Sequence, residues 1–243
     1  MNRLLFVYSM FLVSGLIGLP QNINADQVAS ATVLLDDDFE RDESQEIKDE
    51  VGNGWNTNSR TRAAGNKQVD LIDGTMHIQR HAVADHGVSV THEVAFADAI
   101  ISMRFRIGPK DDLGINIADM NEKSVHAGHI CMAQIRPKQL QIKDLKNGLM
   151  NLTIRTDRKA GKATPEQKAL VKTKIHQTKI DIAPNQWHDL VVKVVGETMT
   201  VSIDDQQVGE FASDGIGHPT KSRLRLAVNR EAWVDDVKVI RLR

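Results

Sequence analysis

The segments WHDLVVKV (residues 187–194), MTVSIDD (199–205), RLRLAV (223–228) and VDDVKVIRL (234–242) decide the fold. Each segment is rich in β-branched residues, and turn residues such as Gly196-Glu197 and Asp204-Asp205-Gln206 separate them. Four short strands at hairpin spacing predict an antiparallel sheet.

Apolar residues recur with a period of two through the rest of the chain, as expected for strands with one buried face. The predicted inner positions are Val88, Val90, Ile101, Met103, Phe105, Ile107, Ile115, Ile117, Leu140, Ile142, Ile180 and Ile182. The alternating positions Ser102, Arg104, Arg106, Asn116, Gln139, Gln141 and Lys143 are predicted to face outward. This pattern indicates an all-β protein built as an antiparallel two-sheet sandwich.

One segment departs from the strand pattern. Residues 157–174 contain Thr164 as a helix N-cap, Pro165 at the first helical position and Gln167 two residues later, which predicts a short helix from Thr164 to Lys172. The sequence shows no internal repeat and no Pro/Gly-rich linker. We therefore expect a single domain over residues 26–243 with a short helical insertion.

The N-terminus resembles a signal peptide. Arg3 precedes an apolar run from Leu4 to Pro20, and small residues near Ala25 suit a cleavage site. The run is short for a permanent span. We expect residues 1–25 to be removed, leaving a secreted or periplasmic protein without an integral membrane span; an uncleaved anchor is the alternative.

The charge balance and the cysteine content exclude several classes of protein. The formal net charge is −1, from 31 basic and 32 acidic residues, which argues against nucleic acid as a partner. Cys131 is the only cysteine, so no intramolecular disulfide can form, and its apolar neighbours predict burial.

Several segments resemble the concanavalin A-like lectin/glucanase superfamily. They are DDDFER (36–41), GNGW (52–55), DGTMHI (73–78), WHDL (187–190) and WVDDVKV (233–239). Within that superfamily the chain is similar to secreted jelly-roll domains related to 3-keto-disaccharide hydrolases and to family-16-like modules. The resemblance implies two curved sheets and a saccharide on the concave face. The Glu-x-Asp-x-x-Glu string of the retaining glucanases is absent, and Asp112-Leu113-Gly114-Ile115-Asn116 is the nearest counterpart of the Asn-Ser-Gly segment common in the hydrolase-like domains.

Histidines are concentrated in the middle of the chain. His77, His81, His126 and His129 are the candidate catalytic residues. His126 and His129 with Asp119 are candidate ligands of a divalent transition metal such as Zn, Mn or Co, and Asp85 and Glu93 could complete the set. The alternative is a set of polar histidines that form hydrogen bonds in a cleft or on the surface.

Carboxylates gather near both ends of the predicted domain. Asp37 and Asp38 begin the first strand, Asp235 and Asp236 enter the last, and terminal strands pair in many jelly rolls. These four are candidate ligands for a structural Ca²⁺, which prefers several oxygen donors. A solvated acidic edge that discourages aggregation is the alternative.

Arginines share faces on two of the predicted strands. The candidate ligand-binding residues are Arg104, Arg106, Asn116, Arg223, Arg225 and Trp233. If they line one concave face, that face is basic and prefers an anionic polysaccharide over a neutral one. The alternative places the arginines on the convex side as solvent cover.

Three functions stay open at this level. The first is an exported domain that binds saccharide on a polar concave face. The second is a metal-assisted 3-keto-glycoside hydrolase or lyase with a histidine as base. The third is a non-catalytic interaction domain of the cell envelope.

Overall fold

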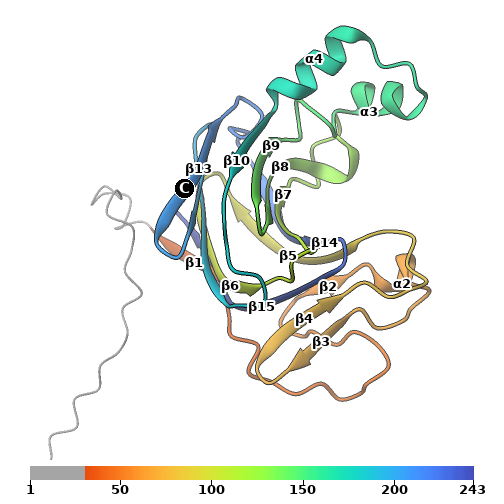
Figure 1. Ribbon diagram of the computed structural model, residues 1–243, viewed down its shortest axis with the longest axis vertical. Helices are drawn as coiled ribbons and strands as arrows, with labels where there is room; N and C mark the ends of the chain where they lie inside the picture. Colours follow the sequence, from red (N-terminus) through yellow and green to blue (C-terminus); the bar gives the residue numbers. More distant parts are fainter. Residues whose placement is uncertain (1–30) are drawn as a thin grey trace, which may run out of the picture.

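The structure is a computed structural model that describes residues 31–243, and the predicted signal peptide lies outside this range. The chain forms two antiparallel β-sheets packed face to face (Figure 1). Within residues 31–243, no helix is long and apolar enough to cross a membrane.

The eight-stranded sheet, called sheet A here, contains the chain's first and last strands. Its members are β1 (Thr32–Asp37), β3 (Val69–Ile72), β4 (Thr75–Gln79), β6 (Ala99–Arg106), β11 (His188–Val195), β12 (Thr198–Ile203), β13 (Gln206–Ala212) and β15 (Glu231–Arg241). The strand order is β13-β12-β11-β6-β15-β4-β3, and β1 also pairs with β15.

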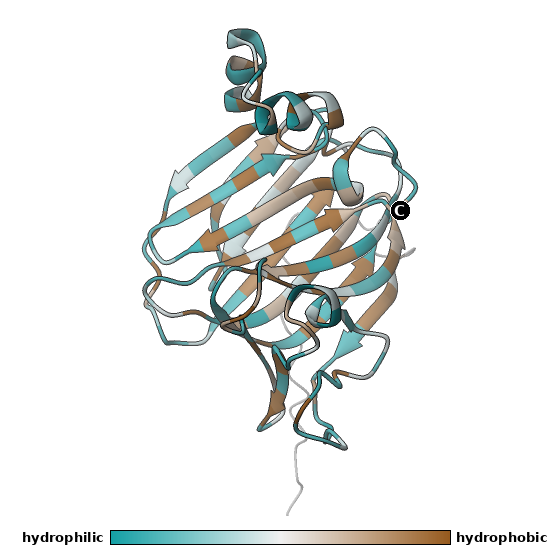
Figure 2. Ribbon diagram, turned by 90° about the vertical axis from the view of Figure 1, so that its right-hand side faces the viewer, coloured by the Kyte–Doolittle hydropathy of each residue, from teal (hydrophilic) through white to brown (hydrophobic). Residues whose placement is uncertain are grey.

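The seven-stranded sheet, called sheet B, lies on the hollow side of the molecule. Its members are β2 (Asn56–Thr57), β5 (Val88–Phe96), β7 (Leu113–Ala118), β8 (His129–Arg136), β9 (Gln139–Asp144), β10 (Ile175–Lys179) and β14 (Lys221–Val228), in the order β10-β9-β8-β7-β14-β5-β2. Its free face, called the open face below, is bordered by α3 and α4 at one end and by β2, β3 and β4 at the other (Figure 1). Figure 2 looks onto this face.

The core lies between the two sheets, where the period-two pattern predicted it. All twelve predicted inner residues are buried, and Ile101, Phe105, Ile115, Ile117, Leu140 and Ile142 are completely so. Cys131 is also buried and free, as expected. The two-sheet antiparallel jelly roll predicted from the sequence is thus confirmed.

Three details of the strand assignment differ from the prediction. The four C-terminal segments are all strands, but β14 belongs to sheet B, while β11, β12 and β15 belong to sheet A. Only Asn229 and Arg230 separate β14 from β15, so the chain crosses between sheets in two residues. Ile180 and Ile182 are buried in the segment that follows β10, and β13 was not predicted.

The helices are short. The predicted helix is α4 (Pro165–Thr173), which Thr164 and Gln167 cap in the reciprocal arrangement expected. A second helix, α3 (Leu152–Lys159), precedes it and was not predicted because its polar residues mask the helical period. The structure also contains a single turn, α2 (Ser59–Arg62), and a 3₁₀ turn, η1 (His126–Gly128).

A substitution at Phe105 tests the packing of the core. The Phe105 side chain is 0% exposed on β6, the strand that pairs with both β11 and β15. Phe105→Ala should lower the free energy of unfolding by about 3–5 kcal/mol, because the cavity cannot close between two fixed sheets. Urea unfolding followed by fluorescence measures this loss. A loss below about 1 kcal/mol would contradict the packing described here.

Candidate functional site

A row of four side chains crosses the open face on neighbouring strands. Arg225 on β14 pairs with Asn116 on β7, Asn116 pairs with Met132 on β8, and Met132 pairs with Lys143 on β9. The sequence predicted outward-facing side chains at Asn116 and Lys143, but Asn116, Lys143 and Arg225 are only 1%, 9% and 8% exposed. Apart from Met132, the row is therefore polar, and its three polar side chains face away from the core yet are shielded from most solvent.

Arg225 is held by neutral partners. Its Nη1 donates to Asn116 Oδ1 (3.1 Å) and lies 2.8 and 3.0 Å from the two ring nitrogens of His129. Its Nη2 donates to the carbonyl oxygen of Ala127 (3.3 Å). Burial lowers the pKa of Arg225 to about 10, so the guanidinium keeps its charge at neutral pH.

The charge of Arg225 is unpaired within the described part of the chain. Within residues 31–243, no Asp or Glu oxygen lies within 4.0 Å of Arg225, whereas Arg223 on the same face pairs with Glu93 at 2.5 Å. A guanidinium has five donor hydrogens, and the contacts above leave Nε–H and one Nη2 hydrogen without a protein acceptor. Every fully buried side-chain nitrogen of residues 31–243 has a hydrogen-bond partner. Nε of Arg225 has no such partner in the described chain, so this atom is accessible to solvent. Arg225 can therefore donate to an oxygen of a ligand.

The two histidines beside Arg225 differ in their accessibility. Burial, reinforced by the Arg225 charge, lowers the pKa of His129 to about 3, and Asn116 Oδ1 lies 3.0 Å from its Nδ1. His129 is thus a neutral ring that fixes Arg225. His126 lies closer to the rim, with ring centroids 6.3 Å apart, and partial burial with the charges of Arg155 and Lys159 also lowers the pKa of His126. A neutral, more accessible imidazole can accept a proton.

A second polar network continues the row. Lys143 Nζ donates to Gln134 Oε1 (2.6 Å), and Gln134 donates to the Asp112 carboxylate. Asn229 Nδ2 donates to the same carboxylate at 2.7 Å. Burial lowers the pKa of Lys143 to about 8, and the nearby Arg136 contributes to this shift. These residues offer donors and acceptors suited to sugar hydroxyl groups.

The six predicted ligand-binding residues do not share one face. Asn116, Arg223 and Arg225 lie on the open face, whereas Arg104, Arg106 and Trp233 lie on sheet A. The pattern of side-chain alternation cannot distinguish the two sheets, because both bury alternate residues. One basic surface made of all six residues is therefore wrong.

Trp233 is not a free stacking platform. Its ring lies 4.0 Å from His77 in a stacked arrangement, and the Arg106 guanidinium carbon lies 4.5 Å from its centroid. Arg104 and Arg106 also lie over Trp187, at 5.1 and 5.3 Å. A sugar could stack on Trp233 only by displacing His77 or Arg106.

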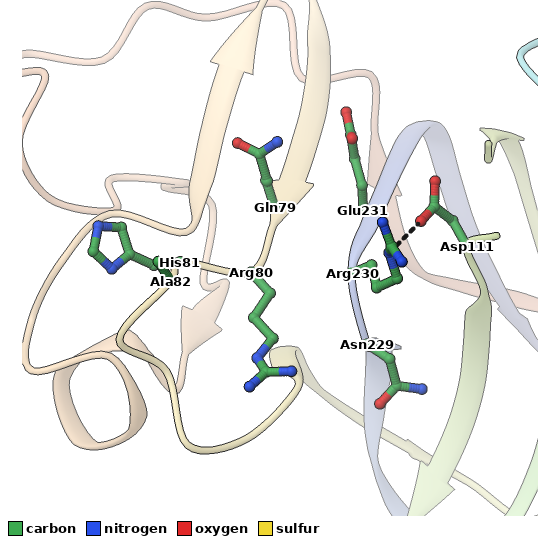
Figure 3. A pocket seen from close by; sticks show the side chains of 8 residues that line it. All are labelled: Gln79, Arg80, His81, Ala82, Asp111, Asn229, Arg230 and Glu231. Carbon is green, nitrogen blue, oxygen red and sulfur yellow. Dashed lines mark ion pairs between the residues drawn. The ribbon is translucent and has the colours of Figure 1, made fainter.

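The four candidate catalytic histidines are split in the same way. His126 and His129 border the open face, whereas His77 lies on sheet A and donates from Nε2 to Glu231 Oε1 at 2.9 Å. His81 lines a cleft of about 510 Å³ at one end of the sandwich, together with Gln79, Arg80, Asp111, Arg230 and Glu231 (Figure 3). Arg230 pairs with Asp111 on one side of this cleft at 3.4 Å (Figure 3). Its charges balance one another, unlike those around Arg225.

The predicted transition-metal site is not assembled. Within residues 31–243, no three His, Cys, Asp or Glu side chains are placed to hold one ion. A register shift between Ile117 and Ala118 sends Asp119 away from His129, and Asp119 instead accepts hydrogen bonds from Thr220 (2.5 Å) and contacts His218 (3.1 Å). Both ring nitrogens of His129 also lie within 3.0 Å of the Arg225 cation. Asp85 and Glu93 are engaged with Arg62 and Arg223.

The predicted calcium ligands do not form an ion site within residues 31–243. Asp37 is buried and accepts hydrogen bonds from Arg41 (2.6 Å), Asn53 (3.0 Å) and the Trp55 indole (2.7 Å). Asp235 pairs with Arg104 at 3.2 Å, with Asp236 near the same arginine at 3.8 Å. Asp38 accepts a hydrogen bond from the backbone N–H of Glu40. β1 and β15 do pair as expected, but Asp37 ends β1 and Asp38 follows it, so neither begins the first strand as predicted. These carboxylates accept hydrogen bonds from protein cations and amides instead.

Sequence reasoning missed the buried network of Lys143, Gln134 and Asp112. The alternation placed Lys143 on an outward face, which normally means solvent. The signal that could have identified it is the continuous presence of polar residues at successive outward positions of two adjacent strands, Gln134 and Arg136 beside Gln139, Gln141 and Lys143.

Solved structures with the same architecture are glycan-related proteins. The chain is 13% identical to an endo-β-1,3(4)-glucanase of family GH16, with a TM-score of 0.58 over 93% of this chain and 95% of that one. It is 11% identical to a laminarinase from Rhodothermus marinus, with a TM-score of 0.54 over 87% and 97%. A sialidase matches at 11% identity and a TM-score of 0.51 over 76% of this chain and 17% of that one. The fold is therefore the jelly roll of the concanavalin-like lectins and glucanases.

The family itself follows from the sequence. A model of the 3-keto-alpha-glucoside-1,2-lyase-like domain matches residues 46–240, and the chain belongs to this domain family. No curated protein matches the chain. The resemblance found in the sequence motifs is thus confirmed, and the domain has a carbohydrate-binding or glycosidase-like fold.

The Asp37 cluster provides a stability test. Burial alone would raise the pKa of Asp37, but hydrogen bonds from Arg41, Asn53, Phe39 N–H and Trp55 outweigh it and hold the pKa below 3.8. The cluster therefore stabilises the fold above pH about 4, and this contribution is lost as the pH falls through the folded-state pKa. Asp37→Asn should cost about 2 kcal/mol at pH 7.

Urea unfolding between pH 2.5 and pH 7 measures this effect. The variant should show a smaller loss of stability in acid than the wild type, and EDTA should shift the melting temperature of neither. A Ca²⁺-dependent rise in melting temperature that Asp37→Asn abolishes would restore calcium to this site.

Proposed function

We propose that this protein binds a saccharide on the open face of sheet B and cleaves it as a 3-keto-glucoside. The single observation that carries the proposal is Arg225, a buried cation without a carboxylate partner in the described chain, held on that face by Asn116 and His129. The family match supports the substrate class.

The reaction would be an elimination. The carbonyl at C3 of the sugar acidifies the hydrogen on C2, so a base can remove that proton. The electron pair forms an enolate, the bond between C1 and the glycosidic oxygen breaks, and the leaving alcohol takes up a proton. Negative charge develops on the C3 oxygen during the first step, and a preorganised donor at that point lowers the barrier.

The residues of the open face would have different roles in this reaction. Arg225 would donate to the C3 oxygen, since Nε–H and one Nη2 hydrogen are free of protein acceptors. Asn116 and His129 would position Arg225. His126, the neutral imidazole at the rim, is our candidate for the proton acceptor. Lys143 and Gln134 would bind hydroxyl groups of the sugar. None of these roles requires a metal ion.

Binding of an anionic sugar without cleavage is the second candidate. An uncompensated guanidinium also suits the carboxylate of a uronate residue. This version of the function predicts affinity for a charged saccharide that weakens with salt, and no product. The two candidates therefore differ in what appears in solution.

The Arg225→Lys variant tests the site. Lys keeps the charge but cannot contact Asn116, His129, Ala127 and the sugar at once, so kcat/KM on a 3-keto-α-glucoside should fall about 100-fold, or about 2.7 kcal/mol. Mass spectrometry of the unsaturated 3-keto product measures cleavage. Arg223→Lys is the matched control, because Arg223 lies two residues away on the same face and already has a partner in Glu93.

The outcomes separate the proposals. A twofold or smaller effect of Arg225→Lys, or an equal loss in Arg223→Lys, would remove Arg225 from the site. A wild-type protein that binds uronate oligosaccharides but forms no product from the keto-sugar would favour the second candidate. The melting temperatures of both variants show whether any loss reflects unfolding.

We also propose that the protein is exported and that residues 1–25 are removed. The support is the charged, apolar and small-residue order of this segment. Intact-mass measurement of the protein purified from its native host should give a chain that begins after Ala25 or within about five residues of it. A mass that includes Met1 would contradict cleavage and favour a retained anchor.

A further inference from the structure

The two helices at the rim of the open face form a basic protrusion. Residues 152–173, which contain α3 and α4, carry six basic and two acidic residues, a formal charge of +4 in a chain whose net charge is −1. The helices project beyond the sheets in Figure 1, and the teal segments of their ribbons at the top of Figure 2 mark hydrophilic residues. The rest of the molecule carries the compensating negative charge.

The cations of this protrusion face solvent and form no ion pair within the part of the chain that the structure describes. Its exposed basic residues are Arg158, Lys159, Lys162, Lys168 and Lys172. No Asp or Glu oxygen within residues 31–243 lies within 4.0 Å of any of them, whereas other lysines of the chain, such as Lys67, Lys138 and Lys174, do form ion pairs. Charges spread over a protein surface would increase solubility, but these cations gather on the single segment that contains α3 and α4.

The protrusion is fixed in place although it buries little. α4 has no buried residue, and α3 buries only Ile154. Asp157 on α3 accepts a hydrogen bond from Gln167 on α4 at 2.7 Å, which joins the two helices. At the base of α3, Leu152 N–H donates to the carbonyl oxygen of Ser124 and His126 N–H donates to that of Met150, both at 2.9 Å. The helices are therefore tied directly to the loop that carries His126.

The cationic surface continues into the open face. The charges of Arg155 and Lys159 act on His126, and Arg155 also acts on His129 beside Arg225. A negatively charged chain lying along α3 and α4 would thus be guided toward Arg225. Such an extended field raises the local concentration of an anionic ligand.

We propose that the α3–α4 protrusion binds an anionic polysaccharide and delivers its chain to the open face. This inference rests on the charge of the segment and on its junction with the loop that carries His126. The inference does not depend on cleavage of a keto-sugar. A membrane surface is less suitable, because helices that lie in a bilayer interface bring an apolar face with aromatic residues. Neither helix contains an aromatic residue, and their exposed large apolar side chains are limited to Leu152 and Leu170.

A charge-reversed variant tests the inference. Lys162→Glu, Lys168→Glu and Lys172→Glu are combined in one variant, and Lys48→Glu, Lys110→Glu and Lys179→Glu form a control with the same change in net charge at exposed lysines elsewhere. Calorimetric titration with polygalacturonate at 50 and 500 mM NaCl measures affinity. We expect at least a tenfold loss in the first variant, less than a threefold loss in the control, and at least a tenfold loss with salt in the wild type.

Further measurements make the result decisive. Far-ultraviolet circular dichroism and melting temperature establish that α3 and α4 persist, and a variant with Gln at the same three positions should show an intermediate affinity. Equal losses in the two charge-reversed variants, affinity for a neutral glucan that equals that for polygalacturonate, or binding to phosphatidylserine vesicles without binding to polygalacturonate would each overturn the proposal. Cleavage of a small keto-disaccharide should be unchanged in the first variant, so a failure here is distinguishable from a failure of the proposed function.

Discussion

The burial of alternate side chains between two sheets is the constraint on which the rest of this structure depends. Residues such as Phe105 on sheet A and Ile115 on sheet B are completely buried because each strand presents every second residue to the same layer. The other residues of each strand must then lie on a free face. Function can therefore be carried by the alternate positions without disturbing the core, provided that their own polar groups are satisfied.

On the free face of sheet B, a charged side chain occupies one of these alternate positions. Arg225 is on the side away from the core yet is 8% exposed, because the turn that contains Ala127 and the first residue of β8, His129, pack against it. Burying a cation without a counterion costs free energy, and neutral acceptors such as Asn116 Oδ1 recover only part of it. The Arg225 cation therefore suits an oxygen-rich ligand that supplies the missing negative charge. That negative charge can be permanent, or it can develop on the ligand during a reaction.

The helical segment next to this face lies outside the core that holds the two sheets together. It contributes almost nothing to the core, since only Ile154 is buried, yet it is held by specific hydrogen bonds at its base. An insertion between β9 and β10 lies at an end of the sandwich, where added residues do not interrupt the strand pairing. Its charge can therefore differ strongly from that of the rest of the chain.

The sequence by itself determined the all-β class, the inner residues and the capped helix α4, because strand alternation and the Thr164–Gln167 capping box are local patterns. Alternation also placed Arg223 with Arg225, and Arg104 with Arg106, on shared faces. It could not assign those pairs to the same or different sheets, since the two-residue step from β14 to β15 changes sheet without changing the pattern. The separation of Asp119 from His129 and the isolation of Arg225 from carboxylates were decided only by the tertiary structure, because both depend on how distant loops pack against one strand face.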